Sequence, residues 1–255
     1  MSFMNIGTSG WVYQGWKEVF YPPSLPAKDM LAYYASIFNT VELNNSFYRM
    51  PSSKNILKWK ENTPDDFVFS CKASRFITHI KKLNDVQDGI HYLFKTLEGL
   101  DKKLGPILFQ LPPYWPLDFE RLDQFIKELP KSFSITFEFR NKSWLCKKVY
   151  DLLLKNNIAL CFYDYKGFQC PEIVTSDFIY LRLHGPHLEP YSGHYKENSL
   201  LDYVHKFTHW DKSVKKIFCY FDNDEKVAAP HDAQLLKKLT LMKGNNHEQY
   251  LDDIK

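Results

Sequence analysis

Residues 178–184 read Phe-Ile-Tyr-Leu-Arg-Leu-His, and the alternation in this segment indicates the fold class. Aliphatic residues occupy positions 179, 181 and 183, and Tyr180, Arg182 and His184 occupy the positions between them. Side chains alternate between the two faces of a strand, so the three polar residues share one face. A parallel strand covered on both sides is normally apolar on both faces. The alternation therefore predicts a barrel strand with its apolar face against helices and its polar face inside.

The same alternation recurs along the chain. Glu138 and Arg140 alternate with apolar residues in residues 134–140, and Glu42 has the matching place in residues 40–44. The strand-like segments are 3–8, 40–44, 67–72, 106–111, 134–140, 158–164, 178–184 and 216–222. Amphipathic helical segments lie at 27–38, 54–62, 89–104, 119–129, 146–156, 199–209 and 233–239. This order predicts an α/β fold, a single (β/α)₈ TIM barrel, with one irregular βα unit between strands six and seven.

The chain length agrees with one such barrel. It has 255 residues, and a TIM barrel takes about 250. The alternative fold is an open doubly wound sheet, which usually carries a glycine-rich nucleotide loop after a strand. The sequence contains neither G-x-G-x-x-G nor a Walker A motif. We predict one TIM-barrel domain over residues 1–242 and a polar C-terminal tail over residues 243–255.

Charge and cysteine usage narrow the class of protein. The net charge is +3, and a dedicated nucleic-acid binder usually has a larger or more clustered basic excess. The five cysteines include no C-x-x-C pair, which indicates reduced thiols without a structural disulfide. No signal peptide and no apolar stretch of about 18 residues are recognised. We expect a cytoplasmic protein without a membrane partner; the oligomeric state is left open.

Polar residues gather at the C-terminal ends of the predicted strands, which is where TIM-barrel active sites lie. They are Asn44, Lys72, Gln110, Arg140, Asp164, His184 and Asp222. Only five of the 33 basic residues are arginines, yet Arg140 and Arg182 both take inward positions. A buried arginine needs an anionic partner. That partner is either a ligand or the carboxylates of Glu42 and Glu138, which would then form a closed ion-pair network.

The candidate roles follow from residue chemistry. Glu42, Glu138 and His184 are the candidate catalytic residues, because carboxylates and imidazole serve as general acids and bases. The candidate substrate-binding residues are Trp11, Tyr13, Asn44, Lys72, His79, Gln110, Arg140, Arg182 and Asn223. The sequence has no cofactor motif and no metal-ligand spacing such as H-E-x-x-H. Asp222 and Asp224 lie in an acidic turn that could hold a divalent metal, although such turns more often cap helices.

Several motifs at these positions occur together in a known family. They are Gly-Thr-Ser-Gly-Trp at 7–11, Thr-Val-Glu-Leu-Asn at 40–44, Gln-Leu-Pro-Pro at 110–113, Glu-Phe-Arg at 138–140 and Arg-Leu-His-Gly at 182–185. The sequence resembles the domain-of-unknown-function 72 family, also called YecE-like, from about residue 7 to 233. The resemblance implies a TIM barrel and no established activity. The family often has histidine where this chain has Asn141, so a mechanism through that histidine does not apply here.

Two functions remain open from the sequence. The first is an enzyme of hydrolase or isomerase type, acting by acid/base chemistry on a polar, anionic or carbohydrate-like small molecule at the C-terminal mouth of the barrel. The alternative is a nucleic-acid-binding barrel, for example a phosphodiesterase, with lysines on the backbone and aromatic residues on a base. A basic groove running past the mouth favours nucleic acid, and a confined polar site favours a small molecule.

Overall fold

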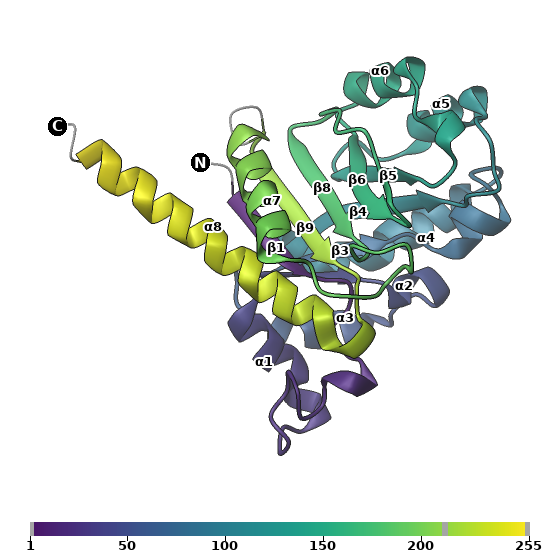
Figure 1. The fold of residues 1–255 in the computed structure, drawn as a ribbon. Helices are drawn as coiled ribbons and strands as arrows, with labels where there is room; N and C mark the ends of the chain where they lie inside the picture. The colour runs from purple at the N-terminus through teal and green to yellow at the C-terminus, as the bar shows by residue number, and fades with distance from the viewer. Residues whose placement is uncertain (1–2, 211–213, 253–255) are drawn as a thin grey trace.

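The computed structural model describes residues 3–210 and 214–252, and its strands form a barrel (Figure 1). The parallel strands are β1 (Phe3–Thr8), β2 (Thr40–Leu43), β3 (Val68–Lys72), β4 (Leu104–Leu111), β5 (Ile135–Phe139), β6 (Ala159–Tyr165), β8 (Phe178–Leu183) and β9 (Lys216–Phe221). Their order in the sheet is β1-β9-β8-β6-β5-β4-β3-β2. All eight predicted strands are present, and the predicted TIM-barrel fold is confirmed.

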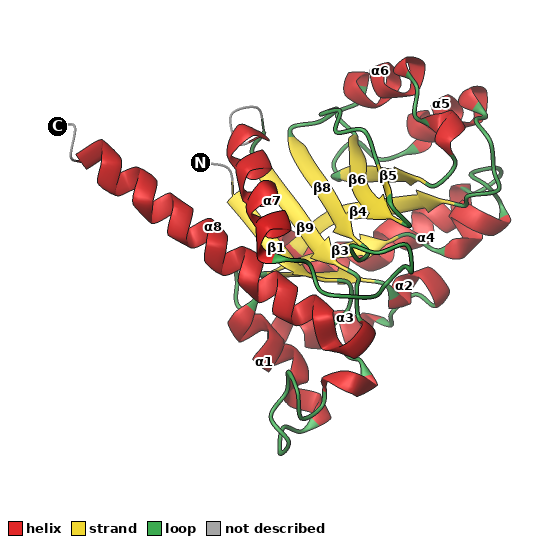
Figure 2. Cartoon of the chain, viewed as in Figure 1, coloured by secondary structure: helices red, strands yellow, loops and turns green. Residues whose placement is uncertain are grey.

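Helices surround these strands (Figure 2). They are α1 (Met30–Ile37), α2 (Asn45–Tyr48), α3 (Ser53–Glu61), α4 (Gln87–Leu97), α5 (Phe119–Glu128), α6 (Lys147–Lys155), α7 (Glu197–Trp210) and α8 (Ala228–Asp252). Side chains cap two of them, because Ser52 Oγ accepts from the Asn55 amide and Asp118 Oδ1 from the Arg121 amide. None of the helices in the described residues has the length and apolarity needed to cross a bilayer.

Helix α8 is longer than the helical segment predicted from the sequence. It begins at Ala228 rather than at residue 233, and its backbone stays helical to Asp252. Its C-terminal half projects away from the barrel in Figure 1. The segment predicted as a polar tail thus continues α8 as far as Asp252, and residues 253–255 lie outside the described residues.

The connection between β6 and β8 contains no helix in the described residues, which confirms the irregular unit predicted there. A two-residue strand, β7 (Phe168–Gln169), pairs antiparallel with the end of β6. Further on, Thr175 Oγ1 accepts from the Leu160 amide at 2.8 Å and donates to the Ile158 carbonyl at 2.7 Å. These bonds tie the loop back to the start of β6.

The barrel closes at a seam between β1 and β2. A single isolated bridge joins Ser9 to Glu42, where the Gly10 amide donates to the Glu42 carbonyl at 2.8 Å. Below it, the Tyr34 hydroxyl accepts from the Thr8 amide at 2.9 Å and lies 3.0 Å from the Thr40 carbonyl oxygen. A Cβ atom on Gly7 would lie 2.2 Å from that same oxygen. Glycine therefore allows the two strands to approach closely enough for the tyrosine to join them.

The interior of the barrel has two layers. Its lower layer is mainly apolar and consists of Leu108, Ala159, Cys161, Phe178, Tyr180, Phe218 and Tyr220. The outer faces of the strands pack on the helices, as Phe109 does on Phe125 of α5, with ring centroids 5.3 Å apart. The upper layer, toward the C-terminal ends of the strands, is charged and forms the candidate site.

Candidate functional site

Arg182 of β8 lies at the centre of the charged layer. Its guanidinium group is 2.8 Å from Glu42 Oε1, 2.9 Å from Glu138 Oε2 and 3.1 Å from Asp222 Oδ2. Burial opposes the charge of Arg182, but the three carboxylates outweigh burial and raise its pKa well above the ordinary value. The side chain is only 1% exposed. Protein carboxylates thus supply the anionic partner that the sequence required.

Arg140 joins the layer from the end of β5. Its Nε donates to Glu138 Oε1, and its Nη2 donates to His184 Nε2 at 2.8 Å. The guanidinium carbon also lies 4.1 Å from the centroid of the Tyr165 ring, a cation–π arrangement. Arg140 is therefore held on three sides at the mouth.

The side chain of His184 is a neutral imidazole whose tautomer is fixed by its contact with Arg140. Arginine can only donate, so Nε2 must accept and the ring proton sits on Nδ1. That Nδ1 lies 3.0 Å from Asp222 Oδ2. Burial, followed by the charge of Arg182, lowers the pKa of His184 to about 4. At neutral pH the ring is uncharged, and its accepting nitrogen is already used by an arginine.

The two predicted catalytic carboxylates are both bound by protein donors. Glu42 accepts from Ser9 Oγ at 2.5 Å and from the Tyr180 hydroxyl at 2.7 Å, in addition to Arg182. Burial alone would raise the pKa of Glu138, but the charges of Arg140 and Arg182 hold that pKa well below its usual range. These carboxylates hold the arginines in place.

Lys72 differs from the other charged groups because no carboxylate holds it. Among the described residues its amine forms no hydrogen bond and no ion pair, and its Nζ lies 4.4 Å from the centroid of the Phe47 ring. Burial, and then the charge of Arg182, lowers the pKa of Lys72 to about 8. Asn44 directly follows β2, the strand that pairs with the strand of Lys72. The Oδ1 atom of Asn44 is buried and has no hydrogen-bond partner.

His79 lies on the same side of the mouth. It belongs to a π-helical turn, Phe76–Ile80, and its Nδ1 is 2.9 Å from Thr78 Oγ1. Its ring meets the Phe47 ring edge-on at 5.0 Å. Burial, and then the charge of Lys72, lowers the pKa of His79 to about 4. Lys72 and His79 therefore share the Phe47 ring as a neighbour.

Gln110 and Tyr13 complete the predicted set near the charged layer. Gln110 is paired in register with Glu138 across β4 and β5, and its Nε2 lies 3.4 Å from the Leu111 carbonyl oxygen. The Tyr13 hydroxyl donates to the Ser9 carbonyl. Burial, and then the charge of Asp222, raises the pKa of Tyr13. Tyr13 thus covers the end of β1 beside the cluster.

Trp11 and Asn223 make their described contacts away from the cluster. The Trp11 ring packs edge-on against Trp59 of α3, with centroids 5.6 Å apart. Asn223 Nδ2 donates to the Gly193 carbonyl at 2.8 Å and to Asp232 Oδ2 at 2.7 Å. Both residues hold loops against helices, so the geometry gives them a packing role.

Asp164 was expected on the inner face of the barrel, and that expectation is wrong. Cys161 of the same strand faces inward, toward Glu138 Oε2 at 3.9 Å, so a residue three positions later faces outward. The Asp164 carboxylate accepts from the His184 amide at 2.8 Å and from the Tyr195 hydroxyl. Burial raises the pKa of Asp164 to about 6. It anchors the loop after β8 instead of lining the site.

The acidic turn after β9 is occupied by protein donors. Asp222 contacts Arg182 and His184, and Asp224 Oδ1 accepts from the Trp16 indole. Across residues 3–210 and 214–252, no group of three or more His, Cys, Asp and Glu side chains is placed to hold a metal ion.

Four residues that contact the charged groups of the site were not predicted as site residues from the sequence. Ser9 and Tyr180 bind Glu42, Tyr165 stacks on Arg140, and Phe47 flanks Lys72. Inward parity identifies Tyr180, because it alternates with the aliphatic residues of its strand just as Arg182 does. Nothing in the sequence indicates which of the chain's many aromatic residues approach a cation.

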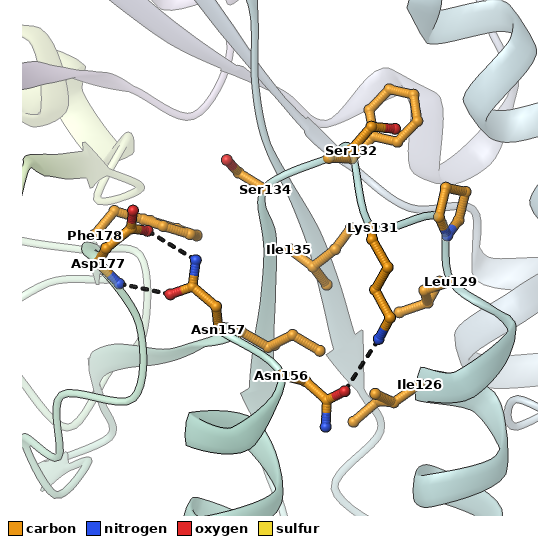
Figure 3. Close-up of a pocket in the computed structure, with 13 residues that line it drawn as sticks. Ile126, Leu129, Lys131, Ser132, Ser134, Ile135, Asn156, Asn157, Asp177 and Phe178 are labelled. Atoms are coloured by element: carbon orange, nitrogen blue, oxygen red, sulfur yellow. Dashed lines mark hydrogen bonds between the residues drawn. The ribbon is translucent and has the colours of Figure 1, made fainter.

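A cavity of about 190 Å³ lies at the other end of the barrel, near the starts of β5, β6 and β8 (Figure 3). Lys131 Nζ donates to Asn156 Oδ1 at 3.0 Å there, and Asn157 exchanges two hydrogen bonds with Asp177. The N-terminal face of a TIM barrel generally serves stability rather than chemistry. Four of its polar residues are thus bonded in two pairs, which agrees with that role.

Fold and site together define a TIM-barrel protein with a buried ion-pair cluster at its C-terminal mouth. The chain belongs to the family described as "Protein of unknown function DUF72", whose model matches residues 5–252. The family predicted from the motifs is therefore confirmed.

Relatives agree with this assignment. UPF0759 protein YunF of Bacillus subtilis is 30% identical over 157 residues, which cover 58% of this chain and 55% of that protein. UPF0759 protein YecE of Escherichia coli K12 is 29% identical over 143 residues, covering 56% of this chain and 50% of that protein. The chain thus spans about half the length of the curated relatives it matches. A crystal structure of a DUF72 family protein from Thermotoga maritima has a TM-score of 0.85 at 27% identity, covering 93% of this chain and 98% of that one.

Proposed function

We propose that this protein is an enzyme that acts by acid/base chemistry on a small polar molecule at the C-terminal mouth of its barrel. The observation that carries the proposal is the amine of the half-buried Lys72, which has no hydrogen bond or ion pair among the described residues although it lies beside a cluster in which both arginines are paired with carboxylates. A group whose pKa lies near the working pH is suited to move protons, and that of Lys72 is lowered to about 8. A cytoplasmic setting remains a prediction from cysteine usage.

In this proposal the predicted catalytic residues act as a platform. Glu42 and Glu138 fix the two arginines, and His184 orients Arg140 through its accepting nitrogen. A preorganised charged platform stabilises charge that develops on a bound molecule without having to rearrange. Lys72 then transfers the proton, while Arg140 faces the ligand.

The test is a comparison of the wild type with Lys72→Met. Each protein is incubated with a bacterial metabolite extract and with a panel of sugars and sugar phosphates, and mass spectrometry follows their depletion. We expect one compound class to be consumed by the wild type, with a rate that rises through about pH 8, and not by the variant. Lys155→Met, which changes an exposed lysine of α6, is the control and should behave as wild type. Equal depletion by Lys72→Met and wild type would refute the role of Lys72.

A specific observation also favours the nucleic-acid alternative. Tyr48, Phe76 and Tyr114 are 74%, 43% and 65% exposed in the segments that follow β2, β3 and β4. Lys82 Nζ lies 5.4 Å from the centroid of the Tyr114 ring, and Lys81 Nζ lies 5.9 Å from that of Phe76. Exposed aromatic rings beside cations can stack on the bases of a single strand. Titration with a fluorescent single-stranded oligonucleotide tests this alternative, which requires binding that weakens with salt and in Tyr114→Ala.

A further inference from the structure

The surroundings of Lys72 indicate which kind of molecule the proposed enzyme takes. The carboxylates of Glu42 and Glu138 bind Arg182, and among the described residues neither forms an ion pair with the Lys72 amine. Ser46 Oγ donates to the Lys72 carbonyl at 2.7 Å and fixes the backbone from which the side chain extends. Burial and the charge of Arg182 lower the pKa of Lys72 to about 8, so about half of the amine is neutral at pH 8. A neutral, desolvated amine is a nucleophile as well as a base.

The charges of the cluster favour a neutral ligand. Three carboxylates oppose two guanidinium groups, and the imidazole between them is uncharged, so one negative charge remains. A positive charge on the Lys72 nitrogen balances this remaining negative charge. An anionic ligand would add a second negative charge without a cation to balance it. The groups concerned are Glu42, Glu138, Asp222, Arg140, Arg182 and His184.

Asn44 supplies a second, independent indication. Its Oδ1 is buried without a hydrogen-bond partner, and it follows β2, the strand that pairs with the strand of Lys72. Buried polar atoms in native proteins are generally satisfied, so an orphaned acceptor at a site suggests a ligand donor. Amide oxygen accepts and never donates, which selects a hydroxyl or amine on the ligand.

We propose that Lys72 forms an imine with a small, uncharged hydroxy-aldehyde or hydroxy-ketone, and that Asn44 Oδ1 accepts a hydrogen bond from its hydroxyl group. This rests on the proposed function and names its substrate class. The lone pair of the neutral amine adds to the carbonyl carbon, and the carbonyl oxygen gains the proton that the nitrogen loses. The hydroxyl of the carbinolamine then takes one proton from solvent and leaves as water, while the nitrogen lone pair forms the C=N bond. The protonated imine keeps one positive charge on the nitrogen, which the cluster balances and the Phe47 ring flanks.

The test is reductive trapping with matched probes. The protein is treated with glycolaldehyde or with propionaldehyde, which carries a methyl group in place of the hydroxyl, and then with cyanoborohydride. Peptide mass spectrometry then measures how fast each of the 28 lysines of the chain is labelled. We expect Lys72 to be labelled at least about tenfold faster than the median lysine at pH 7, because its free-base fraction is larger. Glycolaldehyde should be preferred over propionaldehyde, and Asn44→Leu should remove that preference while Lys72 is still labelled.

The outcomes separate this inference from the proposed function. Labelling of Lys72 no faster than of other lysines with both aldehydes would overturn imine formation. If Lys72→Met still abolishes depletion of a metabolite in that case, the lysine acts as a proton-transfer group and the proposed function stands. Selective labelling without preference for glycolaldehyde, or with a preference unchanged in Asn44→Leu, would overturn the role of Asn44. Lys72→Arg retains the charge and should show no label at position 72.

Discussion

Arg182 contributes both charge and structure at a single position. It is bonded to Glu42, Glu138 and Asp222, which come from three different strands or strand ends. Taking such charges out of water is costly, and the cost is recovered only while every partner is present. The sequence predicted that Arg182 needs an anion, but parity alone could not say whether a ligand or the two glutamates would supply it.

Replacing Arg182 by leucine should therefore damage the fold. Arg182→Leu leaves buried Glu42 without its cation and Glu138 with Arg140 alone, and breaking a buried pair typically costs about 3–5 kcal/mol. Since about 1 kcal/mol shifts Tm by roughly 2–4 °C in a domain of this size, we expect a decrease of roughly 6–20 °C. Calorimetry measures it.

The control for Arg182→Leu is Arg121→Leu, at a half-exposed pair with Asp118 in the first turn of α5. Exposed pairs contribute about 0–1 kcal/mol, so its Tm should move by a few degrees at most. A similar small change in Arg182→Leu would mean that the buried network is not a stabilising unit.

At the scale of elements, alternation along a strand predicted most of the site. Five residues were predicted to share the inner face of the barrel because each alternates with apolar neighbours, and the structure brings them into contact. They are Glu42, Glu138, Arg140, Arg182 and His184. The same argument failed for Asp164, because the inward face of β6 is made of Cys161, Tyr163 and Tyr165 and carries no charge to reveal it. Loop contacts such as Trp11 on Trp59 depend on tertiary packing, which periodicity does not encode.

The β1–β2 seam gives a prediction for an element. Gly7→Ala places a Cβ atom 2.2 Å from the Thr40 carbonyl oxygen, so the strands must move apart and the Tyr34 bridge must lengthen. Overpacking of this kind costs about 1–3 kcal/mol. Urea unfolding measures the loss. Gly15→Ala is the matched control, because its added atom meets only Val227 Cγ2 at 3.7 Å. Equal stability of the two variants would show that the seam tolerates separation.

At the scale of the whole molecule, the barrel ends before the chain does. Leu236 and Leu239 of α8 are buried, whereas Leu241 and Met242 are 61% and 51% exposed. The sequence predicted a boundary after residue 242 from composition, although it did not predict that α8 continues past it. The boundary itself stays a prediction, and the helical backbone continues across it.

Truncation tests how much of α8 the barrel uses. A chain ending at Lys243 should keep its Tm within about 2 °C, because the removed segment lies beyond the last buried side chain described. A chain ending at Asp232 loses Ala233 and Leu236, both 0% exposed, and should melt far lower or fail to fold. Circular dichroism at increasing temperature compares the two. Strong destabilisation of the chain that ends at Lys243 would show that the projecting half of α8 supports the barrel.

The charged layer also constrains the order of events during synthesis on the ribosome. Glu42 and Glu138 emerge early, but the arginine that neutralises both is 140 and 44 residues further along the chain. Until residue 182 has left the exit tunnel, a collapsed N-terminal portion would have to bury Glu42 without its main counter-charge. We therefore expect the nascent barrel to close only after most of the chain has been translated. Contacts between residues so far apart in the sequence also form slowly.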